Sequence, residues 1–265
     1  MAGRATRLVQ RLAYRSRRLG RSVSKAPVGK APPVRFMVLC RARTGSNLLM
    51  SMLEGHPQVL AYGEKLRQAT RPATEKLIDR LHGRRAWWIQ AVGFKMFHDH
   101  PHDQPTNPVW ETLSAVPDLH VVNLWRRNLL HVELSETLAR RSDHWVQRPD
   151  QRNQPDIHVE PITLNPEKLA ERFAAMTRLR KLRRRQLDHL PSLDIEFEDL
   201  RHNRDHIFGR LCRFLSLPER PARPWTLRQR QRPAHELIAN YRELEAHFAN
   251  TPWAEFFDEG QSSLR

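Results

Sequence analysis

A short apolar segment followed by a glycine-containing turn and a helix is the feature that most constrains the fold of this chain. Residues Val34–Cys40 read VRFMVLC, a nearly continuous apolar run typical of a buried strand in a parallel sheet. A polar turn, Arg41–Gly45, comes next, and Asn47–Glu54 is a predicted helix that Gly55 closes and Pro57 stops. A strand, a tight turn and a helix in this order present backbone N–H groups to one point, which suits a phosphate or another oxyanion.

Predicted strands and helices alternate along the rest of the chain. Further strands are expected at Ala91–Phe97, Leu119–Trp125 and Leu193–Phe197. Further helices are expected from Thr70 to about Gly83, after Trp125, from the cap Asn165 and Pro166, from Asn203, and over Pro233–Phe248. The polar, proline-bearing residues 142–163 are expected to form a long loop. This order predicts an α/β fold, a three-layer sandwich with a mainly parallel central sheet.

Length and composition exclude several classes of protein. A chain of 265 residues fits one domain and is long enough to bury a sizeable core. Its two cysteines, Cys40 and Cys212, are too few for a disulfide framework or a cysteine-rich zinc site. The sequence holds no run of 18 apolar residues, so no membrane-spanning helix is expected.

The positive charge is concentrated at the N-terminus. The net charge is +16, and the first 36 residues hold ten lysines and arginines and no acidic residue. We therefore expect a basic, disordered arm over residues 1–33 and a single domain over 34–265. A helix lying on an anionic membrane and an organelle presequence are the two alternatives for the arm. The expected location is cytoplasmic, with peripheral membrane contact through the arm.

The turn after the first strand has the residue types that an anion site needs. Gly45 allows the backbone to bend closely around an oxyanion, Ser46 and Asn47 bring side-chain donors, and Arg43 brings a fixed positive charge. The G-x-x-x-x-G-K-[ST] pattern of nucleoside triphosphatases is absent, which disfavours a magnesium-dependent enzyme of that kind. An ordinary strand-to-helix turn is the alternative interpretation.

The run Arg43–Leu49, followed by His56-Pro57 and Gly63-Glu64, resembles the sulfotransferases that use 3′-phosphoadenosine 5′-phosphosulfate (PAPS). The nodulation and trehalose sulfotransferases of the bacterial carbohydrate branch are the most similar in these motifs. The resemblance implies a P-loop-like sulfotransferase fold and a turn that wraps the 5′-phosphosulfate. The implied cofactor-binding residues in the turn are Arg43, Thr44, Gly45, Ser46, Asn47 and Leu48.

Two later motifs strengthen the resemblance. Arg127 follows the end of a predicted strand and Ser135 lies eight residues further on, a spacing with which the family binds the 3′-phosphate of PAPS. The segment Phe197–Leu200 resembles a late structural signature of the family. Near the C-terminus, Arg228 or Arg230 is implied to close over the cofactor phosphates, with a solvated charge as the alternative.

Three further residues are candidates for catalysis. Lys95 is expected to place a charge near the bridging oxygen of PAPS. The resemblance makes Glu64 the first choice for the general base and His98 the second. Residues 98–103 (HDHPHD) hold ligand types of a zinc site, but Pro101 interrupts them and no metal is expected.

The sequence is therefore interpreted as a PAPS-dependent sulfotransferase that needs no metal. The expected acceptor is a hydroxyl or amine of a carbohydrate or glycolipid. A P-loop-like kinase of nucleotides or small molecules is one alternative, and it would bind Mg·ATP without preference for a 3′-phosphate. A basic nucleic-acid-binding protein is the other, but that function explains neither the turn nor the Arg127–Ser135 spacing, so no nucleic-acid partner is expected.

Overall fold

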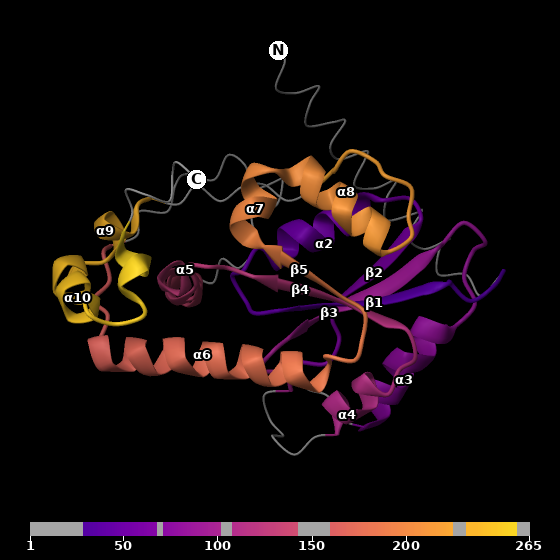
Figure 1. The fold of residues 1–265 in the computed structure, drawn as a ribbon, viewed down its shortest axis with the longest axis horizontal. Coiled ribbons are helices and arrows are strands. Elements are labelled where there is room, and N and C mark those ends of the chain that lie inside the picture. The colour runs from indigo at the N-terminus through magenta and orange to yellow at the C-terminus, as the bar shows by residue number, and fades with distance from the viewer. Residues whose placement is uncertain (1–28, 68–70, 102–107, 143–159, 225–231, 259–265) are drawn as a thin grey trace, which may run out of the picture.

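A five-stranded sheet, all of whose strands are parallel, forms the centre of the molecule, with helices on both faces (Figure 1). The computed structural model describes residues 29–67, 71–101, 108–142, 160–224 and 232–258. The strand order is β2-β3-β1-β4-β5, so the chain crosses over between non-adjacent strands. This arrangement confirms the predicted α/β fold with a parallel central sheet.

The three inner strands coincide with their predictions. They are β1 (Val34–Cys40), β3 (Ala91–Phe97) and β4 (Leu119–Trp125). β1 pairs with β3 from Val34↔Ala91 to Cys40↔Phe97, and β4 pairs along its other edge. Because both faces of an inner strand are covered, all three strands are mostly apolar, which is why the sequence predicted them.

The two edge strands differ from the prediction. β5 (Ser192–Glu196) begins and ends one residue earlier than expected, because Phe197 already belongs to the next helix. β2 (Val59–Glu64) was not predicted. Only its first four residues are buried, and its last two, Gly63 and Glu64, are exposed. Such a short apolar run beside a proline and a glycine lacks a clear strand signal.

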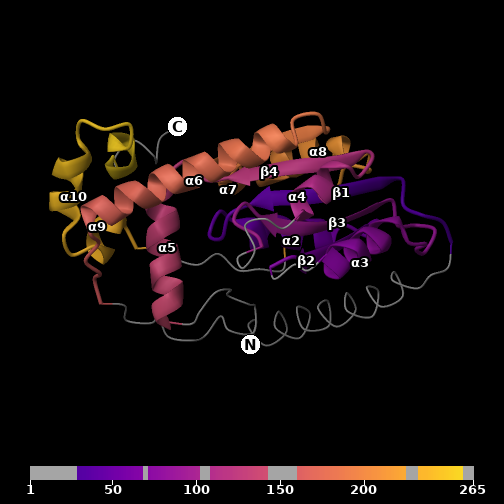
Figure 2. The ribbon, with the colours of Figure 1, turned by 90° about the horizontal axis from the view of Figure 1, so that it is seen from below.

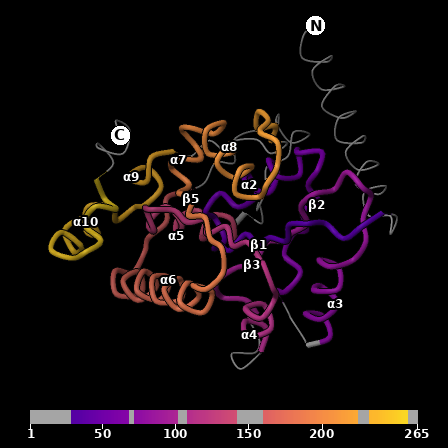
Figure 3. The backbone as a smooth tube through the Cα atoms, turned by 45° about the vertical axis from the view of Figure 1, so that its right-hand side comes forward, coloured from indigo at the N-terminus to yellow at the C-terminus, as the bar shows by residue number. Residues whose placement is uncertain are grey.

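Helices form one layer on each face of the sheet, and a further group of helices packs at one end of the molecule. α2 (Ser46–Gly55), α7 (Phe197–His202) and α8 (Arg204–Phe214) cover one face of the sheet, and α3 (Arg71–His82) and α4 (Val109–Ser114) cover the other (Figure 1). α6 (Pro166–Gln186) runs from the α3–α4 face to the end that holds α5 (Leu129–Ser142), α9 (Ala234–Leu237), α10 (Tyr241–Phe248) and the short 3₁₀ helix Ala254–Phe257 (Figures 2 and 3).

Two helix predictions had different outcomes. The Asn165 cap is confirmed, since its side-chain oxygen accepts a hydrogen bond from the Lys168 N–H at 2.8 Å at the start of α6. The single helix expected over Pro233–Phe248 is wrong. The chain is extended at Ile238, which forms a parallel bridge with Ile162, and these contacts divide the segment into α9 and α10.

The first described residues already contact the domain. Lys30 forms an antiparallel bridge with Arg85, and the Arg84 Nε donates a hydrogen bond to the carbonyl of Gly29 at 2.6 Å. The rest of the predicted basic arm, residues 1–28, lies outside the described residues. Among the helices that the structure describes, none combines the length and apolar character needed to cross a bilayer.

We expect Gly93→Ala to destabilise the sheet strongly. A Cβ at position 93 in β3 would lie 2.3 Å from the carbonyl oxygen of Phe36 and 2.4 Å from its ring, both fixed in β1. Such overpacking costs about 1–3 kcal/mol or more of unfolding free energy, measurable by urea titration. Gly63→Ala is the control, because a Cβ there meets open space. Equal unfolding free energies for the two variants would contradict this packing.

Candidate active site

The turn between β1 and α2 lies at the carboxyl ends of the strands, where parallel α/β sheets bind their ligands. Arg43 and Gly45 both have left-handed backbones, with φ of 65° and 81°, and Gly45 is the N-cap of α2. The Thr44 hydroxyl closes the turn by donating to the Arg41 carbonyl at 2.7 Å. Turns of this kind beside a helix N-terminus form concavities lined by N–H groups, which bind anions.

Gly45 is also required by its neighbour. A Cβ at this position would lie 2.2 Å from the ring of Phe197, the first residue of α7. The buried guanidinium of Arg126 also packs on the Phe197 ring, 4.9 Å from its centre. Burial lowers the pKa of Arg126 to about 10. The Phe197 motif, read from the sequence as a structural signature, therefore supports the turn directly. Arg126 was missed because its neighbour Arg127 fitted the expected spacing.

The structure joins Ser135 to the turn. The Arg43 Nε donates a hydrogen bond of 2.8 Å to the Ser135 hydroxyl, which projects from α5 and is buried. Burial also lowers the pKa of Arg43, with the nearby Glu136 opposing the shift. A positive charge from the turn and a hydroxyl from α5 therefore meet at one point.

The Arg127 side chain pairs with carboxylates rather than with Ser135, the residue with which it was predicted to share a phosphate. Its half-exposed guanidinium pairs with Glu196 at 2.7 Å and with Asp199 at 3.6 Å, and Glu198 lies 4.0 Å away. In the described part of the chain no hydrogen bond joins Arg127 to Ser135. The two residues predicted to share one phosphate are thus each held by other groups.

Glu64, Lys95 and Asn47 form one contiguous group. The Lys95 ammonium lies 2.9 Å from a Glu64 carboxylate oxygen and donates to the Asn47 side-chain oxygen at 2.9 Å. A register shift makes this possible: Tyr62 pairs with Phe94, but Glu64 pairs with Lys95, so Gly63 is an extra residue in β2. Because side chains alternate along a strand, this bulge turns Glu64 onto the α2 face, where Lys95 lies.

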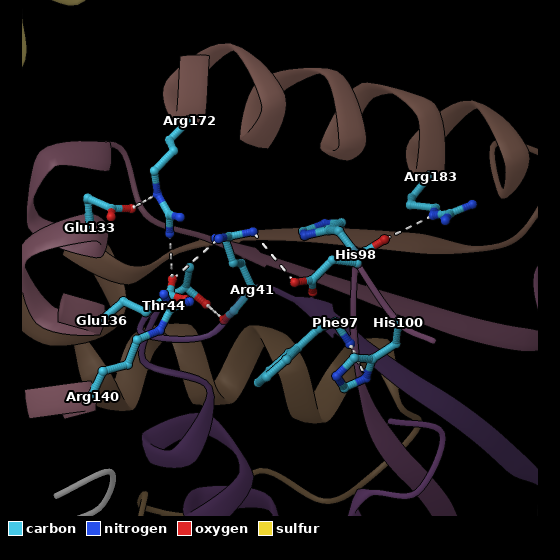
Figure 4. Close-up of polar contacts among 11 residues, drawn as sticks. Arg41, Thr44, Phe97, His98, His100, Glu133, Glu136, Arg140, Arg172 and Arg183 are labelled. Carbon is cyan, nitrogen blue, oxygen red and sulfur yellow. Dashed lines mark hydrogen bonds and ion pairs between the residues drawn. The ribbon is translucent and has the colours of Figure 1, made fainter. Parts of the chain in front are cut away.

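His98 lies on the opposite side of the sheet from this group. Lys95 and Phe97 share one face, with the ammonium 5.1 Å from the Phe97 ring, so His98, three residues after Lys95, faces the other way. Its carbonyl accepts a hydrogen bond from the Arg183 Nε of α6 at 3.0 Å (Figure 4). Burial, and then the charge of Arg180, lower the pKa of His98 to about 3. The imidazole is therefore neutral and weakly basic.

A group of buried and partly buried charges that the sequence analysis missed connects the turn to α5 and α6. Arg41 pairs with Glu136 of α5 at 3.3 Å and lies 3.8 Å from Asp99 (Figure 4). Arg172 of α6 pairs with Glu133 of α5 at 2.5 Å. Glu133 and Glu136 are both buried. Acidic residues within a helix are usually solvated, so no sequence pattern marked them.

The remaining predicted residues have simpler surroundings. Leu48 packs against the core beneath α2. Ser46 is buried and hydrogen-bonds the Cys40 thiol, whose pKa burial raises to about 12, so Cys40 carries no thiolate. Arg228 and Arg230 lie outside the described residues, as do His102 and Asp103. Across the segments that the structure describes, no three His, Cys, Asp or Glu side chains gather as metal ligands would.

Comparison with known proteins identifies similar chains from rhizobia. Nodulation protein H of Rhizobium meliloti is 29% identical over 242 residues, covering 86% of this chain and 96% of that protein. Nodulation protein H of Rhizobium tropici is 25% identical over 240 residues, covering 85% and 94%. No family model matches the chain.

Two solved structures are also similar to this chain. A sulfotransferase from Alicyclobacillus acidocaldarius has a TM-score of 0.49 and 15% identity, covering 86% of this chain and 94% of that one. The sulfotransferase domain from the curacin biosynthetic pathway has a TM-score of 0.44 and 20% identity, covering 73% and 77%.

Stability should depend on pH through His98. The unfolded chain protonates this histidine below its ordinary pKa of 6.5, whereas the folded protein does so only near pH 3. The free energy of unfolding should therefore fall as the pH is lowered from 6.5 towards 3. His98→Gln should remove about 2 kcal/mol of the difference between pH 7.5 and pH 5, measured by urea titration. His120→Gln is the matched control, and an unchanged pH dependence in His98→Gln would contradict the burial of this ring.

Proposed function

We propose that the protein transfers the sulfuryl group of PAPS to a hydroxyl or amine of a carbohydrate or glycolipid acceptor. One juxtaposition carries the proposal. The turn before α2 brings Arg43 to the Ser135 hydroxyl of α5. At the start of α2, the Asn47 side chain accepts a hydrogen bond from Lys95, which also pairs with Glu64. The proposed site for the anionic leaving group would thus lie beside a cation and a carboxylate, groups that can stabilise the leaving phosphate and accept the proton of the acceptor.

The 5′-phosphosulfate would bind at the turn. The backbone N–H groups around Gly45 and at the start of α2 supply donors, and Arg43 supplies a charge whose position the Ser135 hydroxyl fixes. Lys95 would face the bridging oxygen, because Asn47 at the start of the same helix orients its ammonium. Charge that develops on the leaving phosphate is then met by groups already in position.

The 3′-phosphate would bind between Ser135 and Arg127. Arg127 and Asp199 are half-exposed and Glu196 is partly exposed, and ion pairs in such positions contribute about 1 kcal/mol or less each. A dianionic phosphate can therefore displace the two carboxylates at small cost. Arg228 and Arg230 stay predictions for closing this end of the site.

The transfer itself needs a base and a stabilised leaving group. Glu64 accepts the proton from the acceptor's hydroxyl or amine while the oxygen or nitrogen of that group forms a bond to sulfur. The bond between sulfur and the bridging oxygen breaks, and that oxygen keeps the electron pair beside Lys95 and Arg43. We favour Glu64 over His98 because Glu64 shares a face with Lys95, while the buried His98 is a weak base on the other face.

Calorimetric titration with 3′-phosphoadenosine 5′-phosphate (PAP) tests the donor site. We expect tight binding of PAP, weak binding of AMP, and no advantage for Mg·ATP. Arg127→Ala should weaken PAP binding roughly 10- to 100-fold, the effect of losing a hydrogen bond to a charged group, while AMP changes little. Ser135→Ala also removes the hydrogen bond that holds Arg43, so it should weaken the binding of both PAP and AMP. Arg213→Ala, a surface arginine of α8 paired with Glu219, is the control. Equal affinity for PAP and AMP would favour the kinase alternative.

Glu64→Gln tests the base. With labelled PAPS as donor and N-acetylchitotetraose as first acceptor, turnover should fall at least 100-fold while PAP binding stays within a few-fold of the wild type. Glu111→Gln, on the exposed surface of α4, should be fully active. If Glu64→Gln is active and His98→Ala is not, the two assignments are reversed.

A further inference from the structure

Two arginines of α6 lie against tryptophan rings near the carboxyl ends of the strands. The Arg180 guanidinium stacks 3.9 Å from the ring centre of Trp125, the last residue of β4. The Arg183 guanidinium stacks 4.0 Å from the ring centre of Trp110 in α4. Both are partly buried, and burial lowers the pKa of each. Stacking fixes such a group in place and leaves the N–H donors at its edge available.

The two arginines differ in their partners. Arg183 donates to the His98 carbonyl and to the Gln186 side chain, at 3.0 and 2.8 Å. Arg180 stacks on Trp125, but it forms no hydrogen bond or ion pair with any residue that the structure describes. A partly buried guanidinium without a counter-ion is costly, because its desolvation is not compensated.

The acidic residues near Arg180 are already engaged. Asp194 and Glu196 of β5 are the carboxylates whose charges act on Arg180. Asp194 pairs with Arg184 at 2.9 Å, and Glu196 pairs with Arg127 at 2.7 Å. Each acid therefore has an arginine of its own, and Arg180 is the positive charge left over.

The surroundings of His98 also carry more positive than negative charge. The charges of Arg180, Arg41 and Arg183 all act on its ring, and Asp99 is the acid that opposes them. Arg41 in turn pairs with Glu136 (Figure 4) and with Asp99. The α6 side of the strand ends thus combines a neutral imidazole with an excess of fixed positive charge.

We propose that Arg180 binds an oxyanion carried by the acceptor, a carboxylate, sulfate or phosphate, which makes the acceptor an acidic carbohydrate. This inference rests on the proposed function and adds the charge of its substrate. The donor phosphates have their own proposed residues on the turn, in α5 and at Arg127, whereas Arg180 approaches the strand ends from α6. A planar guanidinium fixed on Trp125 matches the two oxygens of such a group.

The test compares an acidic and a neutral tetrasaccharide. Calorimetry at low salt, with and without PAP, measures binding of unsulfated chondroitin tetrasaccharide and of N-acetylchitotetraose. We expect the chondroitin tetrasaccharide to bind about tenfold more tightly. Arg180→Gln should remove that preference while the affinity for the neutral sugar and for PAP stays within twofold.

Matched variants keep the result interpretable. Arg178→Gln, an exposed arginine on the same helix, should retain the preference. Arg180→Lys keeps the charge but loses the planar fork, so it should retain a part of the preference, and it replaces Arg180→Gln if that variant does not fold.

Two outcomes would overturn the inference. One is that the chondroitin tetrasaccharide binds no more tightly than the neutral sugar, with or without PAP, or that the protein's preference for it survives Arg180→Gln. The other is a tenfold loss of PAP affinity in Arg180→Gln, which would assign Arg180 to the donor. Failure of the wild type to bind PAP would instead contradict the proposed function, and the titration without PAP would still report on Arg180.

Discussion

The hydrogen bond from Arg43 to Ser135 is the contact on which the candidate site depends. It joins the turn after β1 to α5, which follows β4, so two crossovers of the sheet meet at one point. Arg43 holds a left-handed backbone there, a conformation that residues with a side chain adopt only where their surroundings enforce it. Phe197 packs against Gly45 from the other side. The turn is therefore held between α5 and α7 before any ligand binds.

Buried charge has a second part in this arrangement. Arg41 and Arg172 each pair with a buried glutamate of α5, and these pairs tie the turn, α5 and α6 together. Buried ion pairs add little net stability, because desolvation offsets their attraction, but losing one partner is costly. Their effect here is to specify how α5 and α6 lie against the turn. The stacked Arg180 lies further along the same helix α6 and is positioned with it.

Sequence patterns predicted the inner sheet and the turn well. The inner strands are apolar on both faces, and a glycine at a strand-to-helix turn has few structural explanations. The side-chain partners were less predictable. Ser135 was chosen for a spacing with Arg127, yet its partner is Arg43, because sequence spacing does not report which way a side chain turns. Glu133 and Glu136 gave no signal at all, since the burial of α5 depends on α6, which follows it by more than twenty residues.

The bulge at Gly63 has a consequence for how such sites change during evolution. One extra residue in β2 moves Glu64 from one face of the sheet to the other and brings it to Lys95. By the same alternation, deletion of one residue between Lys95 and His98 would bring the histidine onto the lysine's face. A single-codon insertion or deletion at a strand end can therefore exchange the side chain that lies beside Lys95 while the turn after β1 is unchanged. Chains that share this turn can thus differ in the group beside the lysine without any change of fold.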